Sequence, residues 1–383
     1  MDDDAFDRIR LLRSPNIGPV TYRQLLARFG SGQTALAALP DLAARGRTGR
    51  GGGYRAAPES LIAAEIVATG HCGARYLFHD SPDYPALLRQ VNGAPPILFA
   101  RGTSDLAQRT PVALVGARNA SAAAIRLSRE FARTLAEAGN AVVSGLARGI
   151  DAAAHRGALG SRVSVAAGGG GTIAVIASGI DVVYPPDHAE LQDEIAEQGL
   201  LLTEMPPGTE PIARHFPARN RIIAGIAEGT LVLEAAPKSG SLITARLAGE
   251  LGREVMAVPG SPLDPRSHGC NQLIRDGAVL VQRAEDVIEL LTSFRGVPRS
   301  HLREDGSDPY VAEAEEASWI GGAAQDDAAL ADIVALLTTA PVSVDELIRQ
   351  TGDAGPGVQL ALIELELAGR LERHAGGRVS LSE

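Results

Sequence analysis

The run F-P-A-R-N-R-I-I-A-G-I-A-E-G-T-L-V-L-E-A-A-P-K-S-G-S, residues 216–241, is the most informative stretch of this chain about its fold. Within it, Arg219–Arg221 stand at the start of an apolar helical run, and a buried-looking strand follows at Thr230–Ala235. The strand ends in the small-residue loop Pro237–Ser241, which opens a second helix. Such a loop presents free backbone N–H groups and the positive end of the helix dipole. The stretch therefore predicts an anion site at the end of a strand.

Lys238, inside that loop, is the only lysine among the 36 basic residues of the chain. A sequence with this bias has exchanged lysine for arginine at nearly every basic position. A lysine that is kept beside a phosphate-type loop indicates a specific role in holding an anion. The alternative explanation for its survival is chance.

Length and composition limit the number of domains and the classes of protein to which this chain can belong. A chain of 383 residues, of which 45% are hydrophobic, can form two or three domains with real cores. It has no apolar run of about 18 residues, so no membrane span is expected. The acidic start lacks the features of a signal peptide, and Cys72 and Cys270 are too few for a disulfide framework or a zinc site. These features predict a cytoplasmic protein without a metal or another cofactor.

The charge of the chain limits how it can bind nucleic acid. The formal net charge is −10, which argues against binding by bulk charge, so any such binding has to use a local cluster of arginines. Only 4% of the residues are aromatic, so few side chains are available to stack on bases. Phe216, beside the Arg-Asn-Arg triplet, is the best candidate for that role.

From residue 111 the chain repeats a pattern of strand, loop and helix. The predicted strands are short, apolar on both faces and separated by helical segments: Val112–Val115, Ala141–Ser144, Thr172–Ala177, Leu200–Glu204, Thr230–Ala235, Glu254–Val258 and Ala278–Val281. This pattern is typical of an α/β fold, a parallel sheet with helices on both sides. Ligands are then expected outside the carboxyl ends of the strands.

Glycine, serine and arginine recur just after these strands. Gly116-Ala117-Arg118 follows the first strand, and the loop after the second strand runs from Ser144-Gly145 to Arg148-Gly149. Glycine allows the backbone to approach a ligand closely, and arginine pairs with phosphate through two N–H groups. Neither loop has the G-x-G-x-x-G dinucleotide fingerprint, and the Lys238 loop is not a Walker A loop.

The two ends of the chain differ from this core. Residues 5–40 are helical in pattern, and Pro15–Val20 inside them looks like either a helix-hairpin-helix turn that approaches phosphate or an ordinary helical hairpin. The C-terminal residues predict three helices and a hairpin, a winged helix-turn-helix whose third helix usually reads DNA. Residues 326–383 hold four basic and ten acidic residues, however. That balance repels a duplex and favours a packing or protein-docking role.

A family resemblance rests on blocks that occur in one order along the chain: Val115–Arg118, Ser144–Asp151, His155, Tyr184-Pro185, Phe216–Ile223, Ser239–Ala245 and Val258–Gly260. Together they resemble the DNA-processing protein DprA (Smf) family over nearly the whole chain. The resemblance implies an extended Rossmann-like core that binds single-stranded DNA, a helical N-terminal domain and a C-terminal winged helix. It also implies a homodimer that protects incoming single strands and loads the recombinase RecA onto them in natural transformation and recombination.

The domain division that follows has four parts: a helical domain of the SAM or helix-hairpin-helix kind at 1–75, the core at 76–292, a polar linker at 293–326 and a winged-helix domain at 327–383. Two features depart from the family. Ala117 stands where the family commonly has Ser or Thr, which removes one hydroxyl contact. The run Leu159–Gly171 is longer than the family's usual connection.

The residues expected to bind DNA share a position on the strand-end loops and the helix starts beside them: Gly116, Ala117, Arg118, Ser144, Gly145, Arg148, Gly149, Phe216, Arg219, Asn220, Arg221, Lys238, Ser239, Gly240, Ser241 and Thr244. They predict a single-strand binder that is not an enzyme. A repressor that reads DNA with the winged helix is disfavoured by the acidity of that domain.

The alternative is a nucleotide phosphoribohydrolase-like enzyme on the same core, which needs a carboxylate beside its phosphate loop. Glu234 is the acid nearest that loop, and we expect a structural role for it. The histidines of this part of the chain are scattered, and none is spaced to activate a nucleophile. A structural role is therefore expected for His155, His188, His215 and His268.

Overall fold

The computed structural model describes residues 3–46, 54–294, 330, 333–351, 355–374 and 376–382, which belong to two compact units. The larger unit covers residues 65–304, and the smaller unit combines residues 1–64 with 305–383. The predicted linker, 293–326, lies outside the described residues except for its first two, which end a helix. Within the described ranges, no helix is long and apolar enough to cross a membrane.

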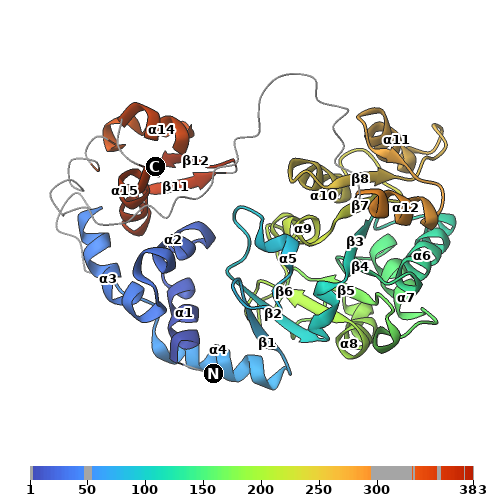
Figure 1. The fold of residues 1–383 in the computed structure, drawn as a ribbon, viewed down its shortest axis with the longest axis horizontal. Coiled ribbons are helices and arrows are strands. Elements are labelled where there is room, and N and C mark those ends of the chain that lie inside the picture. The colour runs from blue at the N-terminus through green and yellow to red at the C-terminus, as the bar shows by residue number, and fades with distance from the viewer. Residues whose placement is uncertain are drawn as a thin grey trace. The chain divides into compact units, whose positions relative to one another are not determined.

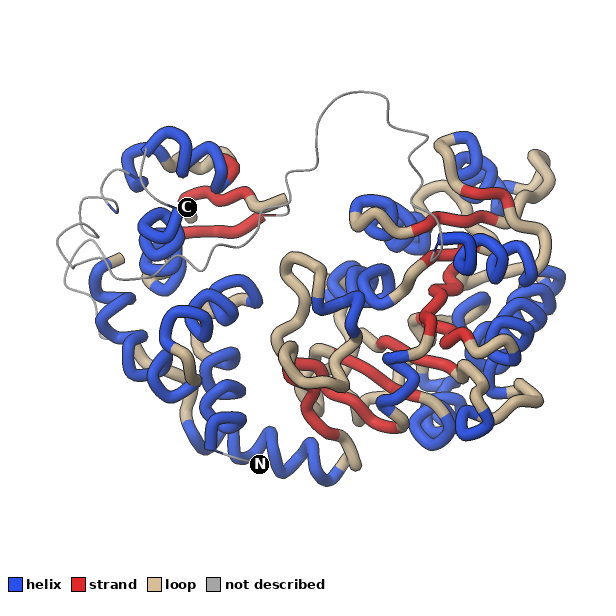
Figure 2. The backbone as a smooth tube through the Cα atoms, in the orientation of Figure 1, coloured by secondary structure: helices blue, strands red, loops and turns tan. Residues whose placement is uncertain are grey.

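A nine-stranded sheet forms the centre of the larger unit (Figures 1 and 2). Its strands, in spatial order, are β1 (Arg75–Phe78), β2 (Ile97–Gly102), β6 (Leu200–Thr203), β5 (Thr172–Val175), β4 (Asn140–Ser144), β3 (Thr110–Val115), β7 (Gly229–Val232), β8 (Glu254–Ala257) and β9 (Val279–Leu280). The strands from β6 to β9 in this order pair in parallel, whereas β2 is antiparallel to both β1 and β6. The predicted parallel α/β core is confirmed, and β2 is absent from the strands predicted from sequence.

Helices lie between and after these strands: α5 (Ala86–Arg89), α6 (Ala122–Glu137), α7 (Ile150–Leu159), α8 (Ala189–Gln198), α9 (His215–Ile226), α10 (Gly240–Glu250), α11 (His268–Arg275) and α12 (Ala284–Phe294). A further helix, α4 (Glu59–His71), precedes β1 and spans the boundary between the two units. The long connection between α7 and β5 contains one short 3₁₀ helix, Val165–Ala167. The sequence placed the triplet Arg219–Arg221 at the start of a helical run. In the structure α9 begins earlier, at His215, so the triplet lies inside the helix.

The alternation of side chains along the strands sorts the helices onto two faces. Val112 and Leu114 of β3 pack in one core with Phe131 of α6, and that core also holds residues of α7 and α12. Ala113 and Val115 belong to the opposite core, with residues of α9, α10 and α11. Successive side chains of a strand point to opposite faces, so fully apolar strands need helices on both sides.

The smaller unit contains three N-terminal helices and a winged helix. The N-terminal helices are α1 (Asp3–Arg13), α2 (Pro19–Phe29) and α3 (Gly32–Arg45). The winged helix contains β10 (Val342–Ser343), α14 (Val344–Thr351), α15 (Gly355–Leu367), β11 (Leu371–His374) and β12 (Arg378–Leu381), with a sheet in the order β10-β12-β11. Before β10, residues 330 and 333–336 are helical. The winged-helix prediction is confirmed.

The third helix of the winged helix, α15, is buried on two faces within the smaller unit. Leu360, Ile363 and Leu367 share a core with side chains of α1, α2 and α3. Leu362 and Leu365 face the core of the winged helix itself. A helix that is apolar all round is expected to be buried all round. One face of α15 is therefore covered by the N-terminal helices and another by the rest of the winged helix.

Candidate functional site

A cleft of about 520 Å³ opens at the carboxyl ends of β3, β4 and β7. We call it the strand-end cleft. Its walls are Val115–Asn119, Ala147, Asp151, Phe216, Pro217, Arg219, Asn220, Ile223, Ala236–Ser241, Ile243, Thr244 and Arg266. The cleft lies where ligands bind in parallel α/β sheets, and it brings together the Gly116 loop and the Lys238 loop that the sequence singled out.

Arg219 is the most unusual residue of this cleft. Its side chain is only 5% exposed, yet it forms no hydrogen bond or salt bridge with any residue that the structure describes, and its Nε is buried without a partner. Burial lowers the pKa of Arg219 to about 10, the charge of Asp151 opposes that shift, and Arg118 adds to it. A buried cation without hydrogen bonds is costly. An anion in the cleft would supply the missing acceptors.

Asp151 is a site residue outside the set predicted from sequence. It is 6% exposed, and its Oδ2 accepts a hydrogen bond of 3.2 Å from the N–H of Gly145. Burial raises the pKa of Asp151, and the charge of Arg219 opposes that rise. Its position in the first turn of α7, directly after a glycine-rich loop, is the sequence signal that could have identified it. Asp151 orders the loop around Gly145.

Glycine at position 145 leaves room for the guanidinium of Arg219, which passes directly over it. A Cβ at position 145 would lie 1.3 Å from Nη1 of Arg219. The next residue, Leu146, has a left-handed φ of +54°, which is rare for a residue with a side chain. The loop therefore brings its backbone against the guanidinium, and some other contact has to hold its strained peptide.

Two buried histidines hold that peptide. The N–H of Leu146 donates to Nε2 of His155 over 3.3 Å, and its carbonyl accepts from Nδ1 of His188 over 3.0 Å. Burial, with a smaller contribution from the charge of Arg219, lowers the pKa of His155 to about 3. His155 is therefore neutral, and its Nδ1–H donates to Oγ1 of Thr172 over 2.8 Å. Both histidines support the loop, in agreement with the structural role expected for them.

The Lys238 loop forms the opposite wall of the cleft. Lys238 is exposed and has a left-handed φ of +68°. Ser239 is the N-cap of α10, and its side chain accepts from the N–H of Ser241 over 3.4 Å. The side-chain amide of Asn220 donates to the carbonyl of Gly240 over 3.3 Å, which ties α9 to this loop. An ammonium, two hydroxyls and a helix N-terminus thus face the cleft together.

An aromatic side chain lines both the strand-end cleft and a smaller pocket of about 70 Å³. This side chain is that of Phe216. The guanidinium of Arg118 lies 5.2 Å from the centre of its ring, and the centre of the Tyr184 ring lies 5.6 Å from the same point. Tyr184 is 41% exposed, and sequence pointed to it only as part of the family resemblance. The two rings offer flat apolar surfaces beside cations.

Some predicted site residues lie away from the strand-end cleft. Arg221 bonds to Glu204 and donates to the carbonyl of Gly93 over 2.9 Å. The hydroxyl of Ser144 is buried and donates to the carbonyl of Leu114 over 2.6 Å. These side chains secure the fold around the cleft.

The second arginine loop lies at the edge of the site. Arg148 lines only the smaller pocket and pairs with Asp187 at 2.6 Å. At Gly149 the second strand-end loop packs against the first, because a Cβ there would lie 2.2 Å from the carbonyl oxygen of Ala117. Its φ of +78° also favours glycine.

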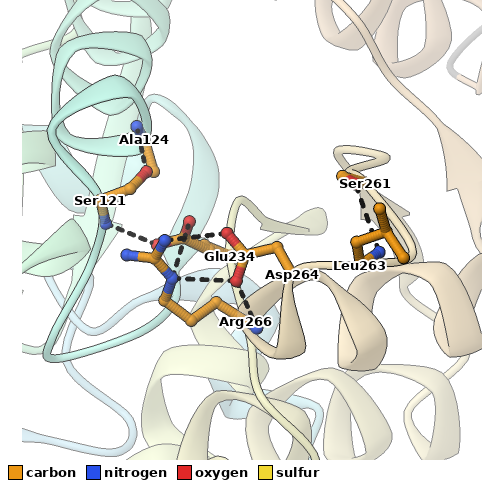
Figure 3. A network of polar contacts seen from close by, with 7 residues as sticks. All are labelled: Ser121, Ala124, Glu234, Ser261, Leu263, Asp264 and Arg266. Atoms are coloured by element: carbon orange, nitrogen blue, oxygen red, sulfur yellow. Dashed lines mark hydrogen bonds and ion pairs between the residues drawn. The ribbon is translucent and has the colours of Figure 1, made fainter.

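Glu234, the acid considered for catalysis, belongs to a network at the rim of the cleft (Figure 3). Its Oε2 accepts from the N–H of Ser121 over 2.8 Å, and its Oε1 lies 4.0 Å from Nε of Arg266. Arg266 is held in turn by Asp264 at 2.8 Å. Glu234 thus links the start of α6 to the loop before α11. Among the described residues, no group of three His, Cys, Asp or Glu side chains could hold a metal ion.

Three family models match the chain. The model described as DNA recombination-mediator protein A matches residues 75–292, the DprA-like N-terminal HHH domain matches 2–68, and the DprA winged helix domain matches 321–377. A curated relative, protein Smf of Synechocystis, is 35% identical over 322 residues, which cover 79% of this chain and 79% of the relative. DNA processing protein DprA of Streptococcus pneumoniae is 47% identical over 205 residues, 54% of this chain and 70% of the relative.

Two solved structures are similar to this chain. The X-ray structure of DprA from Streptococcus pneumoniae is 41% identical, has a TM-score of 0.55, and the match covers 61% of this chain and 78% of that one. A structure of DprA from Helicobacter pylori is 28% identical, has a TM-score of 0.51, and the match covers 58% of this chain and 96% of that one. The Helicobacter pylori protein is described as having a unique single-stranded DNA binding mode.

Proposed function

Because this chain belongs to the DNA recombination-mediator protein A family, the DprA or Smf proteins, we propose that it binds single-stranded DNA through the strand-end cleft. The observation that carries this proposal is the buried guanidinium of Arg219, which has no acceptor among the described residues. A DNA phosphate would supply the acceptor, and Arg118, Lys238 and the N-terminus of α10 surround the same space.

The aromatic pair at the edge of the cleft supports a single strand over a duplex. Bases that are not paired can stack on rings, and such stacking tolerates any base sequence. Phe216 and Tyr184 lie beside the arginines that would hold the phosphates. We therefore infer binding that is dominated by the backbone and only weakly selective for sequence.

The winged helix contributes little to this DNA binding in our proposal. Its third helix, α15, packs on two faces within the smaller unit, and its domain is acidic. A helix that is covered in this way is not available to enter a major groove. A sequence-specific repressor function has no supporting surface among the described residues of this domain.

We infer further that the protein protects incoming single strands and loads the recombinase RecA onto them, as a homodimer, in transformation and recombination. The family description as a recombination mediator supports this role. The site residues expected from sequence that line the strand-end cleft, and the division into domains at 1–75, 76–292, 293–326 and 327–383, remain part of this proposal.

An enzymatic function on the same core is the second candidate, because Asp151 places a carboxyl group with a raised pKa in the cleft. We propose that Asp151 is structural, since it accepts from the N–H of Gly145. Incubation with a panel of nucleoside monophosphates should release no free base on chromatography. Base release that disappears in an Asp151→Asn variant would establish the enzyme in place of the binding protein.

The experiment that tests the cleft replaces Arg118 by Ala. Arg118 lines the cleft and lies over Phe216, so its loss should weaken single-strand binding and reduce the slope of log K against log salt by about one. Fluorescence anisotropy at several salt concentrations measures both quantities. Arg246→Ala is the matched control, because Arg246 is exposed on α10 and pairs with Glu250. Equal affinity and slope in folded Arg118→Ala and in the unmodified protein would refute the assignment of this loop.

A further inference from the structure

A strip of arginines lies on α6 and α7, outside the strand-end cleft. Arg126, Arg129 and Arg133 recur along α6 at spacings of three and four residues, so they share one face of the helix. Arg156 is on α7, and all four side chains are exposed. None of them forms a hydrogen bond or salt bridge with the part of the chain that the structure describes. We call these four residues the arginine strip.

Close packing of the two helices makes the strip continuous. A Cβ at Gly157 of α7 would lie 2.3 Å from the carbonyl oxygen of Arg129, so the helices touch at this point. Arg156 directly precedes Gly157 on α7, so its backbone lies close to this point of contact. Figure 1 shows α6 and α7 adjacent in the larger unit.

The charge of this surface is unusual for the chain. The other charged side chains of α6 are Glu130 and Glu137, and Glu137 accepts from the N–H of Arg162 over 3.3 Å. Four exposed arginines, unpaired within the described part of the chain, thus gather on a protein whose formal net charge is −10. A local cluster of this kind attracts a polyanion even when the whole protein does not.

The strip is continuous with the cleft along the chain. Ser121, which caps α6, directly follows the loop that contributes Gly116–Asn119 to the cleft wall. The twelve residues from Ala122 to Arg133 rise about 18 Å along the helix. A strand that leaves the cleft past Asn119 can therefore follow α6 for several nucleotides.

We propose that the arginine strip binds the phosphate backbone of the DNA strand where it leaves the cleft. This inference rests on the proposed function of the cleft. The partner is a single strand rather than an acidic protein, because the helix that carries three of the four arginines begins beside the cleft wall. Phe131, the one aromatic residue of α6, is buried in the core, so the strip holds phosphates without reading bases.

The test compares a strip variant with a charge-matched control on two lengths of DNA. The strip variant carries Arg126→Gln, Arg129→Gln and Arg133→Gln, and the control carries Arg246→Gln, Arg275→Gln and Arg349→Gln. Arg246 and Arg275 are on helices of the opposite sheet face, and Arg349 is in the smaller unit. The ligands are oligothymidylates of about 6 and about 30 nucleotides, since single-strand sites range from about 4 to 16.

We expect the strip variant to bind the long strand about tenfold more weakly, which is about twofold for each lost arginine contact. Its salt slope should fall by about two, because a single strand contributes about 0.7 for each phosphate. Adding Arg156→Gln should lower the slope by a further ~0.7. Binding of the short strand should stay within about twofold of the unmodified protein, and the control variant should match the unmodified protein on both strands.

Circular dichroism confirms that each variant is folded. Unchanged binding of the long strand by the strip variant would overturn the proposal and leave the strip to an acidic partner. An equal loss on both strands would also overturn it, because the strip would then act within the cleft. Failure of the unmodified protein to bind either strand would overturn the proposed function itself.

Discussion

Two helices of this protein each bury a charged side chain, with opposite outcomes. In α9 of the larger unit, Arg219 is 5% exposed and has no acceptor among the described residues. In α15 of the smaller unit, Glu364 is 1% exposed and pairs with Arg45 at 3.4 Å. A buried charge that has its partner within the protein belongs to the fold, whereas one without a partner marks the place of a ligand.

The surroundings of the two helices agree with this difference. Arg219 opens onto a cleft of about 520 Å³ that also contains Lys238 and the N-terminus of α10. Glu364 is enclosed between the N-terminal helices and the core of the winged helix. We therefore expect substitution of Arg219 in α9 to reduce DNA binding, and substitution of Glu364 in α15 to reduce the stability of the fold.

The largest effect is expected from Arg219→Ala. Loss of the charge-assisted hydrogen bonds to a phosphate should weaken single-strand binding by about 3 kcal/mol, roughly a hundredfold. Anisotropy titration measures this loss, and circular dichroism confirms the fold. Arg221→Ala is the control on the same helix, because Arg221 bonds to Glu204 and the carbonyl of Gly93 and should act on stability. Equal losses of affinity in the two variants would show that the missing acceptor of Arg219 does not mark the DNA site.

Glu364→Ala should lower the stability of the protein and leave its affinity for single-stranded DNA nearly unchanged. Removing the carboxylate leaves Arg45 without its partner at 3.4 Å and opens a gap beside buried α15. Unfolding of the smaller unit should become easier by about 2 kcal/mol. Thermal unfolding measures this change, and single-strand affinity should remain within about twofold of the unmodified protein. A large loss of affinity in a folded variant would place DNA on the winged helix.

Lys238→Ala should weaken single-strand binding by about 1–2 kcal/mol, the scale of one charge-assisted contact. The effect should be smaller than that of Arg219→Ala, because Lys238 is exposed and its charge is screened by water and salt. Affinity at low and high salt measures both points. Retention of full affinity at low salt would mean that this lysine is a chance survivor.

Acid should destabilise the larger unit through His155. The pKa of His155 is about 3 in the folded protein against an ordinary value of 6.5, so the unfolded chain binds more protons between these values. Stability is therefore lost as the pH falls, by about 1 kcal/mol from pH 6.5 to 5.5. Thermal unfolding of His155→Gln at both pH values should show a smaller pH dependence than the unmodified protein. Identical dependence in the two proteins would mean that another group causes it.

The smallest change in affinity is expected from removing residues 320 onward. The strand-end cleft is built from residues of the larger unit, so single-strand affinity should change by less than about twofold. The N-terminal helices lose the cover of Leu360, Ile363 and Leu367 and should unfold more easily. Anisotropy and thermal unfolding separate the two effects. Loss of DNA binding by a truncated protein with a folded core would show that the winged helix reads DNA.

Arg219 and Arg221 show where prediction from sequence reaches its limit. Both stand in one triplet, and their residue type and position predicted the same role for both. Residues two apart on a helix point about 200° apart, so only one of them can face the cleft. Which of the two faces it depends on how α9 packs on the sheet, and that packing is not written in the triplet.

Asp151 shows a second limit. The sequence places it in the first turn of a helix after a glycine-rich loop, where many acids are exposed caps. Its importance follows from burial beside Arg219 and from its bond to the N–H of Gly145, and both depend on contacts made only in the folded chain.

Local sequence patterns were enough to predict the order of strands and helices in the parallel core, the glycine, serine and arginine loops at the strand ends, and the winged helix. Short apolar runs, period-3.6 repeats and turn residues act over a few neighbouring positions, so they can be read without the fold. Which charges are buried, and which of them have partners, became clear only from the folded chain. Glu364 finds Arg45 across 319 positions of sequence, and Arg219 finds no hydrogen-bond acceptor among the described residues, although the charge of Asp151 lies nearby. Pairing over such separations is a property of packing, so no local pattern encodes it.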